Sequence, residues 1–186
     1  MKIGVKRRTV KVVDYDFNWL NEYIKEETVL KKILSNYDVD IQHIGSTSII
    51  GCKAKPIIDI AIGVPNLEYG QKLIPILQKA GYYYDGTADF GVRYFLKKYD
   101  GDIETHFIHI EDKNSRIWQN HIIFRDYMNT EPEKVIEYSN LKENLAQEFF
   151  NDRKSYTKSK EDYIQNIIEK ALEKFKLQAK GENYIM

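Results

Sequence analysis

A glycine-serine turn and a strand-borne acid are the residues of this chain whose types and spacing best suit phosphate chemistry. Gly45 and Ser46 stand at the end of one expected strand, and Asp59 lies at the centre of the next. Glycine permits close approach of a ligand to the backbone, and hydroxyl and N–H groups donate to phosphate oxygens. A carboxylate on a rigid strand can hold a divalent cation against the same phosphates. This order of residues predicts a nucleotidyl-transfer site.

The predicted site lacks the second carboxylate that metal-dependent nucleotidyl transfer usually employs. Alternate residues of a strand point to the same face, so the paired acids are usually spaced i and i+2. Ala61 occupies that position after Asp59. Glu104 and His106 lie on a later expected strand, and they supply the missing metal ligand or general base if they share the face of Asp59. Asp59 and Glu104 are therefore the predicted ligands of Mg²⁺, and His106 is the residue predicted to activate an acceptor hydroxyl.

Further donors and cations complete the predicted phosphate site. Thr47 continues the turn, and Lys55 precedes Pro56, whose ring holds that lysine in an extended conformation. Arg93, on an expected hairpin strand, is either an anion clamp or a solvated strand residue. The predicted phosphate-binding residues are Gly45, Ser46, Thr47, Lys55 and Arg93.

Each of these side chains also has a purely structural interpretation. A Gly-Ser-Thr-Ser cluster is commonly an ordinary loop, and Asp59 can form an ion pair with Lys55 or Arg93. His106 can be a partly buried, hydrogen-bonded imidazole. Cys52 is expected to be a small loop residue, because no histidine or acid lies beside it in the sequence. The functional and structural interpretations both remain open at this point.

Composition limits the class of partner. The 186 residues contain 28 Lys and Arg against 28 Asp and Glu, which gives a formal net charge of zero. A dedicated nucleic-acid binder is normally basic, so the expected partner is a nucleotide or another phosphorylated small molecule and not a large nucleic acid. No apolar run approaches the roughly 20 residues of a membrane span, and the first residues lack a signal-peptide core. A cytoplasmic protein without a membrane partner is therefore expected.

Hydrophobic periodicity places the candidate residues on a mixed sheet. Strands are expected at 39–45, 57–64, 82–84, 91–99 and 103–110, the last two joined by the turn Asp100-Gly101-Asp102. Helices are expected at 15–35, 66–80 with a kink at Pro75, 115–128, 132–150 and 158–178. The layout is α+β: a mixed sheet with helices on one side and a helical C-terminal third. We expect one compact unit, with an α/β core over 1–112 and a helical segment over 113–186 packed on it.

The expected C-terminal helices carry candidate site residues of their own. Arg125 lies near the end of the first, and Tyr156 and Lys160 lie around the start of the last. These side chains can close over a nucleotide from the helical side. Alternatively, Arg125 pairs with an acid and ties the helices to the sheet.

The combination of these motifs resembles the GrpB family. The matching pieces are His43-Ile44-Gly45-Ser46-Thr47, Lys55-Pro56-Ile57-Ile58-Asp59-Ile60, Ala80-Gly81-Tyr82, the histidine-containing strand at 106–109, Phe124-Arg125-Asp126-Tyr127, Tyr138 with Leu141-Lys142, and Tyr156-Thr157 with Lys160. Together they extend from about Val10 to Ala171. One departure is Gln42, where relatives often carry glutamate before the motif histidine, and this departure puts in doubt any role for an acid there.

The resemblance implies a nucleotidyltransferase-like sheet with the Gly45-Ser46 turn and Asp59 at the matching site positions. It implies no known substrate, because the family's biochemical role is obscure, and the missing second carboxylate belongs to the family pattern. The favoured hypothesis is a protein that binds a nucleoside triphosphate with Mg²⁺ and transfers a nucleotidyl group to an unknown acceptor. Two alternatives remain open: a catalytically silent nucleotide- or phosphometabolite-binding module, and a metal-dependent hydrolase that uses Asp59, Glu104 and His106.

Overall fold

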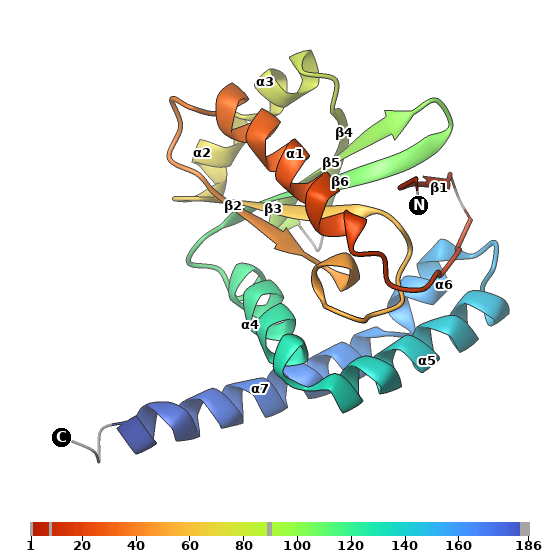
Figure 1. Cartoon of the computed structure of the whole chain (residues 1–186). Coiled ribbons are helices and arrows are strands. Elements are labelled where there is room, and N and C mark those ends of the chain that lie inside the picture. Colours follow the sequence, from red (N-terminus) through yellow and green to blue (C-terminus); the bar gives the residue numbers. More distant parts are fainter. Residues whose placement is uncertain (1, 8, 89–90, 183–186) are drawn as a thin grey trace.

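The computed structural model describes residues 2–7, 9–88 and 91–182, which form a six-stranded sheet with helices on both faces (Figure 1). The strands are β1 (Val5–Lys6), β2 (Asp40–Ile44), β3 (Ile58–Val64), β4 (Tyr83–Ala88), β5 (Arg93–Asp100) and β6 (Ile103–Asp112). Their order is β2-β3-β6-β5-β4, and β1 pairs with the start of β6. β3 and β6 are parallel and the other pairs are antiparallel, so the sheet is mixed, as the hydrophobic pattern predicts.

The central strand β3 decides which face of the sheet receives the candidate acid. Ile58, Ile60 and Ile62 are fully buried on one face, in the main hydrophobic core. Full burial of one such side chain contributes about 1.5–3 kcal/mol, so the strand cannot slip by one residue without losing several of these contributions. Asp59 and Ala61 alternate with the isoleucines and therefore point to the opposite face.

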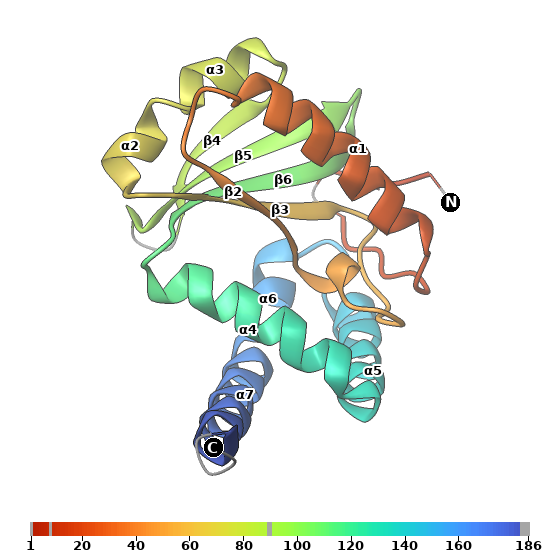
Figure 2. The same cartoon turned by 60° about the vertical axis from the view of Figure 1, so that its left-hand side comes forward.

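Three helices cover the face that holds the main core (Figure 2). They are α1 (Asn18–Ile33), α2 (Leu67–Gln71) and α3 (Ile74–Lys79). Asn66 caps α2, because its side chain accepts a hydrogen bond from the backbone N–H of Tyr69. Pro75 lies in the first turn of α3, where its missing N–H removes no helical bond. The kink predicted in the helix over 66–80 is thus a break into two helices.

The helices of the C-terminal third lie on the opposite side of the sheet (Figure 2). They are α4 (Arg116–Thr130), α5 (Pro132–Glu148), α6 (Arg153–Lys158) and α7 (Glu161–Glu182). The last expected helix is preceded by a separate short one, which begins where Asp152 accepts a hydrogen bond from the Ser155 N–H. A second core joins α4, α5 and α7 and includes Phe124, Tyr138 and Ile168. No helix in the described part of the chain is both long and apolar enough to cross a membrane.

The hairpin of β5 and β6 carries a bulge that separates two predicted site residues. Lys98 pairs with His106, whereas the next residue, Tyr99, pairs with Glu104. Thr105 is therefore an extra residue in β6, and the alternation of side chains is interrupted there. Uninterrupted alternation predicts Glu104 and His106 on one face, and the bulge places them on different faces.

Candidate functional site

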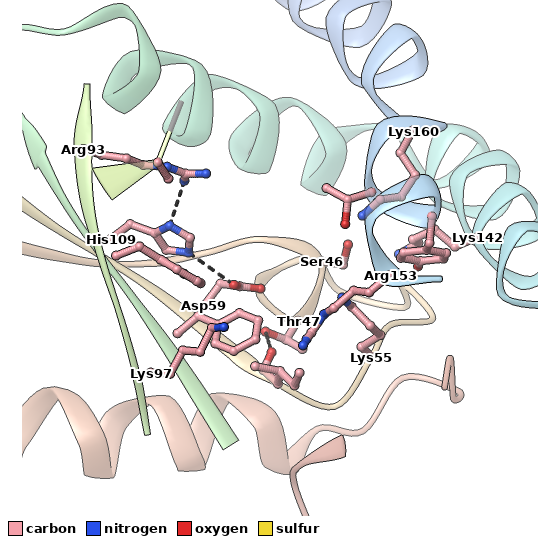
Figure 3. Close-up of a pocket in the computed structure, with 16 residues that line it drawn as sticks. Ser46, Thr47, Lys55, Asp59, Arg93, Lys97, His109, Lys142, Arg153 and Lys160 are labelled. Carbon is pink, nitrogen blue, oxygen red and sulfur yellow. Dashed lines mark hydrogen bonds and ion pairs between the residues drawn. The ribbon is translucent and has the colours of Figure 1, made fainter. Parts of the chain in front are cut away.

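A cavity of about 340 Å³ lies between the second face of the sheet and the C-terminal helices (Figure 3). The sheet and its loops contribute Lys55, Asp59, Arg93, Lys97 and His109 to its lining, and the C-terminal helical segment contributes Lys142, Arg153, Tyr156 and, from the turn between α6 and α7, Lys160. Segments that are far apart in the sequence therefore meet around one space.

The structure brings most of the predicted phosphate-site residues to this cavity. Its lining includes Ser46, Thr47, Lys55, Asp59 and Arg93. Gly45 lies directly behind the acid and has a left-handed backbone conformation with φ of +70°. A Cβ at this position would lie only 2.6 Å from Oδ2 of Asp59. Glycine is therefore required here both for its backbone conformation and for the close approach of the turn to the acid.

The two hydroxyls at the start of the turn have different roles. Thr47 Oγ1 lies 3.0 Å from Nε2 of His43 and donates to the carbonyl oxygen of Ile57 over 3.4 Å. These contacts hold the turn against the neighbouring strands, so the Thr47 hydroxyl, a predicted phosphate donor, is already engaged. Ser46 also lines the cavity, and its side chain lies near that of Tyr138 on α5.

His109 connects the acid to an arginine. Its Nδ1 lies 2.7 Å from Nη1 of Arg93, and its Nε2 lies 3.3 Å from Oδ1 of Asp59 (Figure 3). A guanidinium group only donates hydrogen bonds, so Nδ1 accepts and Nε2 carries the proton that is donated to Asp59. Burial lowers the pKa of His109, which agrees with this neutral form. Burial raises the pKa of Asp59, but the hydrogen bond from His109 and the charge of Lys55 outweigh it, and the pKa lies below its ordinary value.

His106 does not share the face of Asp59, in contrast to the arrangement that a metal or base role for it requires. In the parallel ladder Asp59 pairs with Phe107, and His106 pairs with Ile58, whose side chain belongs to the main core. His106 Nε2 lies 3.9 Å from Oε2 of Glu26 on α1. Burial lowers the pKa of this histidine. It is a buried imidazole on the far side of the sheet, which matches the structural interpretation.

Glu104 reaches the side of the cavity because of the bulge, but it is already paired. Its carboxylate contacts the guanidinium of Arg153, and its Oε1 lies 3.7 Å from Nζ of Lys97. It therefore orients two cations. In the described ranges of the chain, no three His, Cys, Asp or Glu side chains are grouped so that they could hold a metal ion. The ligand set of Asp59, Glu104 and His106 that was expected for a metal-dependent hydrolase is not assembled.

The position of the missing second carboxylate is closed by helix packing. Ala61 is fully buried and packs with Ile44 and with Trp118 of α4. Two residues further along β3, a Cβ at Gly63 would lie 2.7 Å from the same indole ring. The indole therefore covers the part of the sheet on which an i+2 acid would stand, and an acid there would be buried away from water.

Cations greatly outnumber acids in the cavity. Four lysines and two arginines line it, and Asp59 is the one acid among its described lining residues. Three of the cations have carboxylate partners: Arg93 with Glu111, Lys97 with Asp85 and Glu104, and Arg153 with Glu104. The other three are Lys55, Lys142 and Lys160, which have no carboxylate within ion-pairing distance among the residues that the structure describes.

For two of these lysines, the surroundings in the cavity disfavour the charged form. Burial, together with the positive charges of Arg153 and Lys160, lowers the pKa of Lys55 to about 7. Burial and the charge of Lys142 lower the pKa of Lys160 to about 8. Their ammonium groups lie 5.2 and 4.7 Å from the centroid of the Tyr156 ring, which compensates only part of the lost hydration. Both ammonium groups therefore lie in the cavity with little compensation for their lost hydration.

Lys142 is the site residue that sequence reasoning had the best chance of finding. It stands four residues after Tyr138 on the buried stripe of α5, where an apolar residue is expected. Its side chain is 1% exposed, and its Nζ lies 3.0 Å from Sγ of Cys52 and donates to the carbonyl oxygen of Lys53. Cys52 is thus a buried loop residue, as predicted, but it lies against an ammonium group. Lysine on an apolar stripe was the available signal.

Arg125 holds the helical segment to the sheet and does not line the cavity. Its Nη1 donates to Oε1 of Gln42 over 2.9 Å and to the carbonyl oxygen of His43 over 3.0 Å. The structural interpretation applies to this residue: Arg125 pairs with an acid, its neighbour Asp126, over 2.7 Å from Nε to Oδ1, and its link to the sheet is made through an amide and a backbone carbonyl. Tyr156 and Lys160, the other two helical candidates, do line the cavity.

Known proteins resemble this chain over most of its length. The family model described as GrpB protein matches residues 9–170. The glutamate-rich protein GrpB of Alkalihalophilus pseudofirmus is 37% identical over 171 residues, which are 89% of this chain and 98% of that protein. The UPF0157 protein YqkA of Bacillus subtilis is 32% identical over 89% of this chain, and the match spans 48% of YqkA.

Two solved structures share the fold. The crystal structure of GrpB from Enterococcus faecalis superimposes with a TM-score of 0.80 at 32% identity and covers 89% of this chain and 99% of that one. A crystal structure of the Cid1 poly(U) polymerase with MgGTP bound gives a TM-score of 0.50 at 11% identity, over 70% of this chain and 42% of that one. At this identity the second match concerns the fold alone.

Proposed function

This chain belongs to the GrpB family, and from that premise we propose that its cavity binds the phosphate groups of a phosphorylated small molecule. The observation that carries the proposal is the gathering of six cationic side chains around one acid in a space of about 340 Å³. The formal net charge of the chain is zero, so this gathering is not a by-product of a basic composition. Desolvated cations without carboxylate partners favour an anionic ligand that replaces their lost hydration.

Different lining residues make different contacts with the proposed ligand. Lys55 and Lys160 neutralise the ligand's charge, because their ammonium groups have no carboxylate partners among the described residues. Arg153, oriented by Glu104, offers a planar pair of donors that matches two phosphate oxygens. Asp59 repels phosphate oxygens and accepts a hydrogen bond from a hydroxyl group of the same ligand or of a second one. This arrangement distinguishes a phosphorylated alcohol from free inorganic phosphate.

A second candidate function is nucleotidyl transfer from a nucleoside triphosphate to a hydroxyl acceptor. It is favoured by the position of Asp59 in the same cavity as Ser46, together with the fold shared with a polymerase. In such a reaction the acceptor oxygen forms a bond to the α-phosphorus, the bond from that phosphorus to the α,β-bridging oxygen breaks, pyrophosphate leaves, and the proton of the acceptor hydroxyl passes to water. Mg²⁺ would supply charge neutralisation at the phosphates, and a single carboxylate suits an ion whose other ligands are phosphate oxygens and water. His109 keeps Asp59 ionised and oriented for this purpose.

Calorimetric titration with inorganic tripolyphosphate tests the binding proposal. We expect saturable binding, and a rise in melting temperature of several degrees at 100 times Kd, where ligand binding adds about 2.7 kcal/mol of stability. Lys160→Met is expected to remove both effects, because it takes away an unpaired cation of the cavity. Lys158→Met, an exposed lysine two residues earlier, is the matched control and should leave both unchanged. Equal binding by Lys160→Met and the wild type would contradict the proposal.

Release of pyrophosphate tests the transfer reaction. Each nucleoside triphosphate is incubated with Mg²⁺ or Mn²⁺ and a panel of hydroxyl acceptors, with wild type and Asp59→Asn in parallel. Transfer predicts release that depends on an acceptor and falls by orders of magnitude in Asp59→Asn, whereas tripolyphosphate affinity without metal is retained. Binding without release under all of these conditions favours the silent module.

A further inference from the structure

A second cavity, of about 500 Å³, continues from the first between α4 and α7. Six residues line both spaces and mark the opening between them: Ser46, Asp59, Arg93, His109, Thr157 and Lys160. Beyond this opening the lining is mainly apolar and includes Ile44, Ile117, Phe124, Ile164 and Ile168. One ligand can therefore extend from the cationic space into an apolar one.

The charge of the lining changes from one cavity to the other. None of the described residues that line only the second cavity is a lysine or an arginine, and two of them, Glu161 and Asp162, are acids. Both acids are exposed in the first turn of α7, where a negative charge also favours the helix dipole. Two amide side chains, Asn120 and Gln165, lie in the same lining. This end of the site repels a further phosphate and accepts hydrogen bonds from N–H groups.

We propose that the second cavity receives an aromatic ring that bears an amino group, so that the ligand is a bipartite molecule with an aminated nucleobase at one end and phosphates at the other. The inference rests on the proposed phosphate site, which anchors the other end. A flat ring buries a large apolar area among the isoleucines and Phe124, and its amino group faces carboxylate and amide oxygens. Asp59, at the opening, then lies beside the hydroxyl-bearing part that joins ring and phosphates.

The test compares ligands that share phosphates and differ in the other end. Affinities of tripolyphosphate, CTP and UTP are measured by calorimetry without metal. We expect CTP to bind at least ten-fold more tightly than tripolyphosphate because of the ring. CTP should also bind several-fold more tightly than UTP, because the two bases have the same size and only cytosine carries an amino group.

Filling the second cavity isolates the contribution of the ring. Ile164→Trp is expected to reduce CTP affinity to the level of tripolyphosphate and to leave tripolyphosphate affinity unchanged. Ile117→Trp, from the α4 side of the same cavity, serves as an independent variant if the first does not fold. Ile136→Trp, at an exposed position of α5 that lines neither cavity, is the matched control.

The two proposals fail in different ways. Equal affinities for CTP and tripolyphosphate, or a CTP affinity that survives both filling variants, would overturn the bipartite ligand and leave the phosphate site standing. Equal affinities for CTP and UTP would overturn the proposal that the second cavity recognises an amino group on the ring. Absence of tripolyphosphate binding would overturn the phosphate site and this inference with it.

Discussion

At the scale of a single residue, the charge of Lys55 should favour phosphate binding and lower the stability of the ligand-free protein. Its ammonium group has no carboxylate partner among the described residues, and burial together with two neighbouring positive charges lowers its pKa to about 7. Holding such a charge in the empty cavity costs free energy, and a bound phosphate recovers it. Removing the charge should therefore help the free protein and harm the complex.

We expect Lys55→Met to raise the free energy of unfolding by about 1 kcal/mol, which is about 2–4 °C in melting temperature for a chain of this size. The same change should abolish tripolyphosphate binding. Thermal unfolding and calorimetry check the two effects, with Lys158→Met as the control. A lower melting temperature with unchanged affinity would mean that Lys55 is a packing residue.

Protonation of the buried lysines should couple ligand binding to pH. The pKa values of Lys55 and Lys160 are lowered to about 7 and about 8, so the free protein loses these protons as the pH rises through that range. A bound anion raises both pKa values again, so binding takes up protons between about pH 7 and 9. Affinity for tripolyphosphate should accordingly fall as the pH rises over this interval.

Calorimetry in buffers of different ionisation enthalpy measures this proton uptake. The free energy of unfolding of the ligand-free protein should instead increase with pH across the same range. The reason is that the unfolded chain binds more protons at these lysines than the folded protein does. Affinity that is constant from pH 7 to 9 would show that neither lysine is neutralised by the ligand.

At the scale of elements, the contact between α4 and β3 decides how many acids the site can hold. Trp118 covers Ala61, so the strand position that would complete a carboxylate pair is part of the hydrophobic packing. The missing acid is therefore a consequence of where the helix lies on the sheet. Restoring the acid alone should damage the fold and should not create a metal site.

Ala61→Asp is expected to lower the free energy of unfolding by about 3 kcal/mol, because it buries a carboxylate against an indole ring. Ala61→Asn separates the effect of charge from that of size and should cost less. Removing the ring should relieve the carboxylate, so the cost of Ala61→Asp combined with Trp118→Ala should be smaller than the sum of the single costs. Denaturant unfolding of the four variants measures this coupling, and strict additivity would exclude the packing explanation.

Hydrophobic pattern was sufficient to predict the longer strands and most helices, because burial of alternating or stripe-forming apolar residues determines both. It failed at Thr105, since a bulge depends on ladder hydrogen bonds and leaves no pattern of side-chain types. Regular alternation predicts Glu104 and His106 on one face for that reason, whereas in the structure Phe107 and His109 share the face of Asp59. Because of this one inserted residue, His109 and not His106 lies on the same face of the sheet as Asp59.

The two halves of the candidate site were not equally accessible to sequence reasoning. Gly45 and Ser46 directly follow β2, and Asp59 lies on the neighbouring strand β3, so their proximity follows from local order. Lys142 and Arg153 reach the cavity only because α5 and α6 pack back across the sheet. In the sequence Arg153 stands among many charged residues, and the place of Lys142 on the apolar stripe of α5 indicates burial but does not connect it to the turn.

At the scale of the whole molecule, the cavity lies between the sheet and the C-terminal helices. A ligand that contacts both should therefore reduce the motion of these helices relative to the sheet. We expect tripolyphosphate to slow amide hydrogen exchange in α6 and in the first turns of α7, because the ligand ties Arg153 and Lys160 to the sheet. Exchange in α2 and α3, on the opposite face, should not change. Mass spectrometry of exchanged peptides measures both, and equal protection everywhere would mean that the ligand only stabilises the protein globally.

The concentration of cations in one cavity of a chain with zero formal net charge also bears on how fast a ligand arrives. A molecule without net charge attracts ions only through the uneven distribution of its charges, and such a field acts over short distances. Ionic screening has a length of about 8 Å at physiological salt, so added salt weakens this field. Association rate constants for tripolyphosphate in stopped-flow experiments should therefore decrease as salt is added, although the protein as a whole carries no excess of positive charge. Diffusion of the ligand would be guided only over the last stretch before the cavity.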